Sequence, residues 1–229
     1  MKLKRVQRVS LIVLLAFIVT LAFSLFPLGK RNEIHGFRLI KQSYIGSIQS
    51  TVFQYEHVKS GAKLIYLKND DKNRTFSISF RTPPDDNSGV NHIIEHCLLD
   101  GSENYPVKSI VSAMKSRSMY TFFNAYTGSD VTGYVASSTN ERDFQNLIYV
   151  YMDAVFHPNV LHNKNIFLQE AGHYEFDPSN SELSYTGVVY NEVKDGASSP
   201  YELLYSKIYQ SLLPDTVYRW NSGGDPAEI

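Results

Sequence analysis

Two histidines four residues apart, with a glutamate directly before the second, are the residues of this sequence best suited to chemistry. They are His92, Glu95 and His96, in the run His-Ile-Ile-Glu-His. On an α-helix, residues i and i+4 share a face, so both imidazoles can bind one metal ion. Catalytic zinc usually takes three protein ligands and one water molecule. Glu95 flanks the pair and could accept a proton from that water, so the pattern predicts a hydrolytic zinc site.

Two histidines need a third ligand, and the downstream acidic residues supply candidates. Glu192 lies in an apolar, helix-like stretch, residues 187–194, where an unpaired carboxylate would be costly. Spacing alone does not choose between Glu192 and Glu170, Glu175 or Glu182. The alternative to a metal site is an exposed helix face with two solvated histidines.

The remaining metal-binding residue types are interpreted as structural. Cys97 is the single cysteine, which excludes an internal disulfide and a cysteine-based zinc site. A lone cysteine on a helix is most often a small buried hydrophobe, and we expect this of Cys97. The other histidines are also expected to be structural: His35, His57, His157, His162 and His173.

Composition fits a folded domain and argues against nucleic acid as a partner. Hydrophobic residues make up 43% of the 229 residues, and the net charge is −1. Beyond residue 31 there is no cluster of lysine and arginine that would form a phosphate-binding stripe.

The N-terminal segment differs from the rest of the chain. Residues 1–10 are basic, and residues 11–28 are apolar and uncharged. As a helix the apolar run would be about 27 Å long, enough to cross the hydrocarbon core of a bilayer. It is interpreted as a hydrophobic helix that is either a transmembrane anchor or a cleaved signal peptide. Residues 29–45 are expected to be a connector, and residues 46–229 a single domain.

The remaining pattern predicts an α+β fold with a mixed, largely antiparallel sheet packed with helices. Proposed strands are residues 51–56 and 62–67, forming a hairpin, then 75–81, 120–127 and 131–138. Helices are expected at residues 88–99 with Ser88 as N-cap, 106–115 opened by Pro106, 139–157, 164–173, and 186–213 with an interruption near 196–200. A polar turn is expected at residues 177–182.

Several ordered motifs resemble the pitrilysin/insulinase clan of inverted-zincin peptidases, and within it the presequence protease-like branch. The run from His92 to Pro106 is similar to the corresponding run of the clan. The other matching segments are residues 55–57, 61–64, 69–71, 80–84, 123–127, 136–140, 187–194 and 222–226. The resemblance covers about residues 35–229.

The resemblance implies roles for particular residues. His92, His96 and Glu192 would bind Zn²⁺, and Glu95 would be the general base. The strand at residues 122–126 would pair with the substrate backbone, with Phe122, Phe123, Asn124 and Ala125 as substrate-binding residues. Asn124 is the side chain expected to touch substrate. The alternative for this segment is an ordinary sheet strand.

The implied activity is zinc-dependent endopeptidase action on short, unstructured peptides. Members of this family have four homologous units in two halves, and this chain matches one unit. We therefore expect a fragment that binds zinc but hydrolyses peptides poorly without the missing C-terminal half. Two alternatives are a non-catalytic homologue that serves as an assembly or chamber partner, and a membrane-anchored interaction domain with incidental histidines.

The first prediction concerns topology. Four cations lie before the apolar run and two follow it, so the positive-inside rule places the catalytic domain outside the cytoplasm, anchored in the membrane or secreted. A reporter fused after residue 229 should be active only in the extracytoplasmic compartment. Reporter activity in the cytoplasm would contradict this placement.

Overall fold

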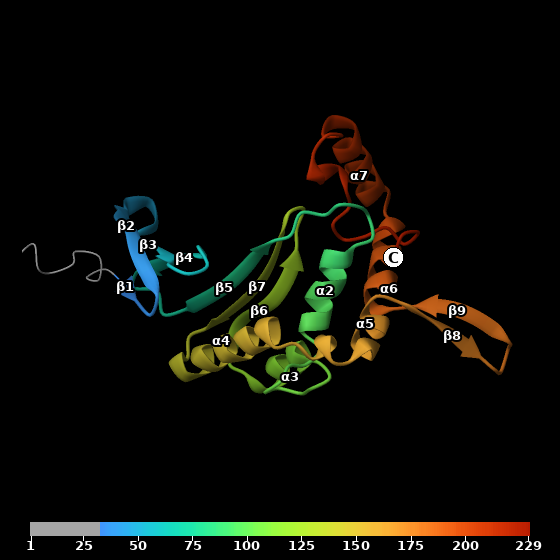
Figure 1. Cartoon of the computed structure of the whole chain (residues 1–229), viewed down its shortest axis with the longest axis horizontal. Coiled ribbons are helices and arrows are strands. Elements are labelled where there is room, and N and C mark those ends of the chain that lie inside the picture. Colours follow the sequence, from blue (N-terminus) through green and yellow to red (C-terminus); the bar gives the residue numbers. More distant parts are fainter. Residues whose placement is uncertain (1–32) are drawn as a thin grey trace, which may run out of the picture. The chain divides into compact units, whose positions relative to one another are not determined.

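The computed structural model describes residues 33–229, which form two compact units with a boundary between Asp71 and Lys72 (Figure 1). The predicted hydrophobic helix at residues 11–28 lies outside the described residues. Within residues 33–229, no helix combines the length and the apolar character needed to cross a membrane. The described chain is α+β with antiparallel strand pairs, as the sequence predicted.

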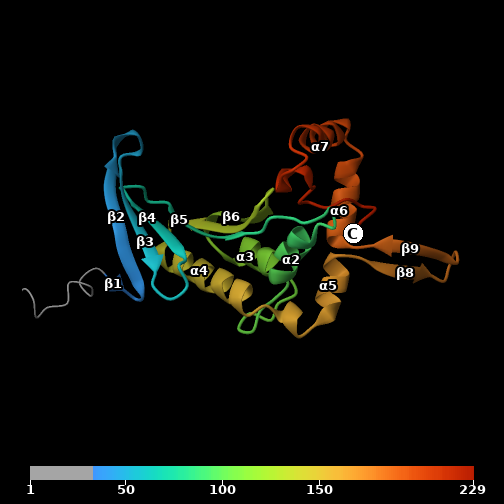
Figure 2. The same ribbon diagram turned by 45° about the horizontal axis from the view of Figure 1, so that its top comes forward.

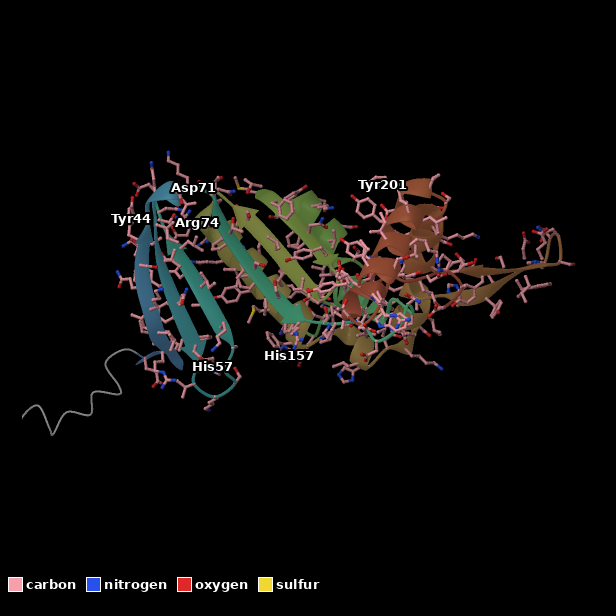
Figure 3. All side chains as sticks on the ribbon, turned by 90° about the horizontal axis from the view of Figure 1, so that it is seen from above. Tyr44, His57, Asp71, Arg74, His157 and Tyr201 are labelled. Atoms are coloured by element: carbon pink, nitrogen blue, oxygen red, sulfur yellow. The ribbon has the colours of Figure 1, made fainter. Side chains whose placement is uncertain are left out.

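The first unit contains a four-stranded antiparallel sheet in the order β1-β2-β3-β4. Its strands are β1 (Glu33–Ile34), β2 (Phe37–Ile45), β3 (Ser50–His57) and β4 (Lys63–Lys68). The predicted hairpin is confirmed as β3 and β4, in a register that pairs Thr51 with Lys68. Figure 3 shows Tyr44 and His57 near opposite ends of this sheet.

The expected connector at residues 29–45 is wrong where the structure describes it. Residues 37–45 form β2, which pairs with β3 from Phe37↔His57 to Ile45↔Ser50. Backbone hydrogen bonds to a neighbouring strand stabilise this segment, although its side chains are mostly exposed and include Arg38, Lys41 and Gln42. The usual apolar–polar alternation is therefore weak, and the sequence did not indicate a strand.

The second unit contains a three-stranded antiparallel sheet in the order β5-β7-β6. The strands are β5 (Arg74–Arg81), β6 (Tyr120–Thr127) and β7 (Val131–Ser138), close to their predicted bounds. Helix α4 (Glu141–Phe156) packs along this sheet (Figure 2), and Asn140 caps it by accepting a hydrogen bond from the backbone of Asp143. The main core lies between them, with the rings of Phe123 and Tyr151 stacked at 4.5 Å.

Two helix starts differ from the sequence prediction. Helix α2 (Val90–Leu98) has Gly89 as its N-cap, at φ 66°, in place of Ser88. The Ser88 hydroxyl donates to Asp86 instead, and so it is not available to cap the helix. Helix α3 (Ile110–Arg117) starts after Ser109, whose hydroxyl accepts from the Ser112 backbone, rather than at Pro106. In both places a local side-chain hydrogen bond decided the boundary.

The C-terminal part of the second unit contains a hairpin that the sequence did not predict. Helix α5 (Lys164–Glu170) is followed by β8 (His173–Asp177) and β9 (Glu182–Thr186), and these strands flank the predicted turn. The hairpin projects away from α5 and α6 (Val188–Ala197), as Figures 1 and 2 show. Helix α7 (Pro200–Leu212) completes the interrupted helical stretch that was expected here.

A second, smaller core joins α2, the end of α5 and α6. It consists of Ile93, Cys97, Ala171 and Val189. Cys97 is fully buried, so its interpretation as a small hydrophobe is confirmed. Burial raises the pKa of its thiol to about 12, and the thiol therefore stays protonated at neutral pH.

Gly187, directly before α6, lies so close to the backbone of Ala171 and Gly172 that a side chain would not fit there. A Cβ atom at this position would lie 2.6 Å from the Cα of Gly172. Gly187→Ala should therefore reduce the free energy of unfolding by about 1–3 kcal/mol, the usual cost of overpacking. Gly196→Ala, on the same helix and facing open space, should instead stabilise by about 0.5–1 kcal/mol. Urea denaturation of both variants tests this, and equal effects would contradict it.

Candidate metal centre

The two histidines of α2 and Glu192 of α6 converge on one point. The His92 and His96 rings lie one turn apart, with centroids 4.9 Å apart and planes at 82°. The Nε2 atom of His92 is 3.9 Å from one oxygen of Glu192, and Nε2 of His96 is 3.7 Å from the other. Donors at about 2.0–2.2 Å from a tetrahedral ion lie roughly 3.4 Å apart, so the three groups fit zinc after small adjustments.

The opposite nitrogen of each imidazole is held by the protein. Nδ1 of His92 lies 3.0 Å from the backbone carbonyl oxygen of Gly223, which can only accept, so Nδ1 carries the proton. Nδ1 of His96 lies 3.1 Å from a carboxylate oxygen of Glu170. These contacts leave both Nε2 lone pairs directed at the common point, and such partners fix the tautomer and orientation of metal-binding histidines.

Glu170 is buried and belongs to a small polar network behind His96. Gln169 donates to one oxygen of Glu170 at 2.9 Å and to Asp100 at 3.0 Å. Burial alone would raise the pKa of Glu170, but hydrogen bonds from His96 and Gln169 outweigh it and hold that pKa below its usual value. Burial opposes the charged form of His96 too, yet Glu170 leaves the pKa of His96 raised. Burial and the charge of Glu170 raise the pKa of Asp100 to about 6.

The structure separates the four acidic residues that spacing left open. Glu192 faces both Nε2 atoms, whereas Glu170 contacts the far side of His96. Glu175 lies in β8 and pairs with His173 at 3.1 Å, and Glu182 lies in β9. Among residues 33–229, His92, His96 and Glu192 are the only group of three whose donor atoms could hold a metal ion.

Glu95 lies between the two histidines in sequence, but its carboxylate is not part of the group that could hold a metal ion. Its side chain is buried, and one oxygen accepts a hydrogen bond of 2.6 Å from the Thr127 hydroxyl at the end of β6. Thr127 is itself 3.5 Å from the Thr132 hydroxyl, which pairs with Thr82 at 2.7 Å. A row of hydroxyls therefore fixes the orientation of this carboxylate.

Strand β6 is an edge of its sheet in the described part of the chain, next to α2. Phe123 and Ala125 face the core, while Phe122 and Asn124 are exposed. The carbonyl of Asn124 accepts a hydrogen bond of 2.9 Å from the Tyr151 hydroxyl, which leaves a second lone pair. The edge position agrees with pairing to an extended peptide, and the substrate-binding role of these four residues stays a prediction.

Sequence reasoning assigned no role to Gly223 or Thr127, and it considered Glu170 only as a candidate third ligand. All three lie inside or near segments already singled out, but their contacts cross between elements distant in sequence, and only the fold brings them together. Of the five histidines expected to be structural, His173 is held by the Leu168 carbonyl and Glu175, and His157 lies beside Asp153. None of the five joins the cluster within residues 33–229.

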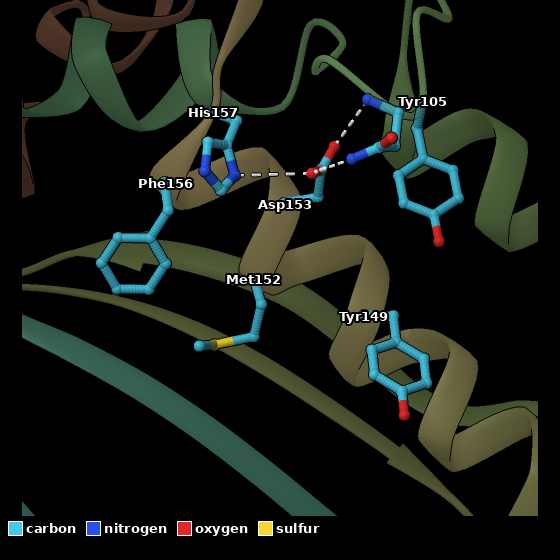
Figure 4. Close-up of a pocket in the computed structure, with 7 residues that line it drawn as sticks. Tyr105, Tyr149, Met152, Asp153, Phe156 and His157 are labelled. Carbon is cyan, nitrogen blue, oxygen red and sulfur yellow. Dashed lines mark hydrogen bonds and ion pairs between the residues drawn. The ribbon is translucent and has the colours of Figure 1, made fainter.

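A separate hollow lies beside the C-terminal half of α4 (Figure 4). It is lined by Asn104, Tyr105, Tyr149, Met152, Asp153, Phe156 and His157. Its acid, Asp153, already accepts two hydrogen bonds from Asn104. It does not include His92, His96 or Glu192.

The chain belongs to the family described as Insulinase (Peptidase family M16), whose profile matches residues 80–214. The resemblance noted from the motifs is thereby confirmed. Protein HypA of Clostridium perfringens is 46% identical over 201 residues, covering 87% of this chain and 21% of that protein.

Relatives from eukaryotes match the same region. Presequence protease 1, chloroplastic/mitochondrial, of Arabidopsis thaliana is 41% identical over 194 residues, covering 85% of this chain and 18% of that protein. The mitochondrial presequence protease of Drosophila melanogaster is 41% identical over 199 residues, covering 85% and 19%. The chain thus spans about a fifth of the length of these curated relatives.

The geometry predicts one zinc ion per chain. His92→Ala or Glu192→Ala should abolish most zinc binding, because each removes one of three converging donors. His173→Ala should keep the zinc, because this histidine lies outside the cluster. Elemental analysis of the purified variants measures the ratio. Zinc content that is unchanged in His92→Ala and Glu192→Ala would refute the assignment.

Proposed function

We propose that this chain is the metal-binding and catalytic unit of a zinc endopeptidase that degrades short, unstructured peptides. One observation carries the proposal: the Nε2 atoms of His92 and His96 converge with the carboxylate of Glu192. The buried carboxylate of Glu95 lies on the same helix as the two histidines, α2. Membership of a peptidase family supports it. The activity, substrates and partners of the whole protein are part of the proposal, because the matched region is only 21% and 18% of the length of two of these relatives.

The donor set suits zinc in a catalytic site. Two histidines and one glutamate are a set that zinc hydrolases use, and three protein ligands leave a position for water. When bound, zinc polarises the scissile carbonyl and lowers the pKa of that water. The side chain of Glu192 is 59% exposed and that of His92 is 14% exposed, so the cluster is open to solvent on the side of α6.

Glu95 is proposed as the general base. Thr127 donates to one of its oxygens, so the other oxygen is free to take a proton from the attacking water. The same carboxyl group can then pass this proton to the amine that leaves. Because Glu95 is not among the three converging donors, its proton chemistry does not disturb the ligand set.

The edge strand β6 is proposed as the place where the peptide lies. An extended peptide that adds to this edge would form backbone hydrogen bonds, which tolerate many side chains and so suit degradation of varied peptides. Phe122 and Asn124 are exposed on β6, while Thr127 in the same strand contacts Glu95. The strand would thus bring the scissile bond near the base.

The N-terminal pattern carries the rest of the proposal. Basic residues 1–10 and apolar residues 11–28 support a catalytic domain outside the cytoplasm, anchored in the membrane or secreted after cleavage. Peptides are then the partners, together with the further units that the longer relatives contain. Nucleic acid is not a partner on this proposal.

Glu95→Gln tests the mechanism. The variant should keep its zinc but lose peptide hydrolysis by at least about 10²–10⁴-fold, because an amide cannot act as the base. Glu175→Gln, an exposed glutamate on β8, is the matched control and should retain full activity. Hydrolysis of an unstructured peptide should be measured in the protein at its full natural length, together with zinc content.

Three results would change the proposal. Retained activity in Glu95→Gln would remove this residue from the mechanism. Loss of zinc in the same variant would place Glu95 among the ligands. No hydrolysis by the unaltered full-length protein, with zinc bound, would favour the non-catalytic homologue.

A further inference from the structure

The last nine described residues form a loop against the start of α2, which we call the clasp (residues 221–229). Its Gly223 carbonyl is the hydrogen-bond acceptor for His92 Nδ1. The clasp is more than 120 residues from α2 in sequence, so other contacts must hold this carbonyl in place. The clasp has no part in the mechanism proposed above.

Asn87, in the loop before α2, makes three hydrogen bonds to the clasp. Its side-chain oxygen accepts from the Asn221 backbone at 3.0 Å, and its side-chain nitrogen donates to Glu228 at 2.8 Å. Its backbone carbonyl accepts from the Asp225 backbone at 2.7 Å. One asparagine therefore fastens both ends and the middle of the clasp.

Glycines allow the two backbones to approach closely. A Cβ atom at Gly89 would lie 2.8 Å from both the Gly223 carbonyl oxygen and the Gly224 Cα. Gly224 has φ 110°, a conformation that side chains rarely adopt. Ile229 then packs against the small core that contains Ile93 of α2. Asn87 and these contacts together bring the Gly223 carbonyl within reach of the imidazole.

We propose that Asn87 is a positioning residue for the metal centre, which acts through the clasp to fix the tautomer and orientation of His92. If the clasp loosens, the Gly223 carbonyl no longer holds the proton on Nδ1. The proton can then move to Nε2, the nitrogen that the metal requires unprotonated. The inference rests on the proposed function in that His92 is a metal ligand.

The polarity of the Asn87–Glu228 pair permits a sharp test. Asn87→Asp keeps the oxygen that accepts from Asn221, but it loses the donor and places a carboxylate against Glu228. The double variant Asn87→Asp/Glu228→Gln restores a donor–acceptor pair in reverse, because the new glutamine can donate to the new aspartate. The double variant also keeps the net charge of the unaltered chain.

A matched control exists elsewhere in the same unit. The side chain of Asn104 donates to Asp153 at 2.7 Å, and neither residue belongs to the His92, His96 and Glu192 cluster. Asn104→Asp therefore also sets two carboxylates against each other. This variant should lower stability without affecting His92.

Two measurements on the 229-residue chain decide the matter. Zinc affinity is obtained by competition with a chelator, and the His92 tautomer of the metal-free chain by nitrogen-15 NMR. Asn87→Asp should bind zinc about tenfold more weakly and show mixed tautomers. The double variant should return to within about twofold of the unaltered chain, and Asn104→Asp should match the unaltered chain in both measurements.

Other outcomes overturn the inference. Unchanged zinc affinity and tautomer in Asn87→Asp would show that the clasp does not control His92. An equal loss in Asn104→Asp would point to general loosening, and no recovery in the double variant would show that the side-chain pair between positions 87 and 228 does not position His92. An unaltered chain that binds no zinc would overturn the proposed metal centre itself, a result distinct from these three.

Discussion

The packing of α6 against α2 is the constraint on which the rest of the second unit depends. The proposed metal-binding atoms come from both helices, so a shift between the helices would change the distances from Glu192 to the two imidazoles. A small core of Ile93, Cys97, Ala171 and Val189 lies between the helices, and Val193 of α6 packs against it. Because protein interiors pack closely, even a core of this size resists small displacements. The absence of side chains at Gly172 and Gly187 lets the backbones at the base of α6 approach.

Each imidazole has one nitrogen held by the protein and one directed at the proposed metal position. The carbonyl of Gly223 and the carboxylate of Glu170 engage the Nδ1 atoms, and both Nε2 atoms face Glu192. The two partners differ in character. A neutral carbonyl orients His92, whereas an anionic carboxylate also stabilises positive charge on His96 and makes this imidazole a stronger donor. Glu95 faces a hydroxyl, which orients a carboxylate without neutralising it.

The sequence predicted the parts of this molecule that rest on local pattern. Strong periodicity predicted α4 and the strands β5 to β7. The spacing of His92 and His96 predicted the position of the candidate metal site on α2. The choice of Glu192 as the third ligand required the resemblance to a known family, because spacing alone does not distinguish Glu192 from Glu170, Glu175 and Glu182. Strand β2 was missed because its pairing depends on backbone contacts that leave little trace in side-chain hydrophobicity. The predicted start of α2 was wrong because the Ser88 hydroxyl donates to Asp86 and does not cap the helix. The predicted start of α3 was wrong because Ser109 caps the helix by accepting from the Ser112 backbone.

The β8–β9 hairpin has a consequence for how this site can vary. In the chain it lies between Glu170, which contacts the imidazole of His96, and Glu192, which faces both imidazoles. The hairpin nevertheless projects away from α5 and α6, the helices that carry these two residues (Figure 1). At its base, Gly172 and Gly187 bring the two ends of the hairpin into direct backbone contact. The number of residues between the two halves of the proposed metal centre is thus independent of their distance in space. Residues can be gained or lost in the hairpin without moving a ligand, so the number of residues between His96 and its acidic partner is a poor guide to the geometry of the site.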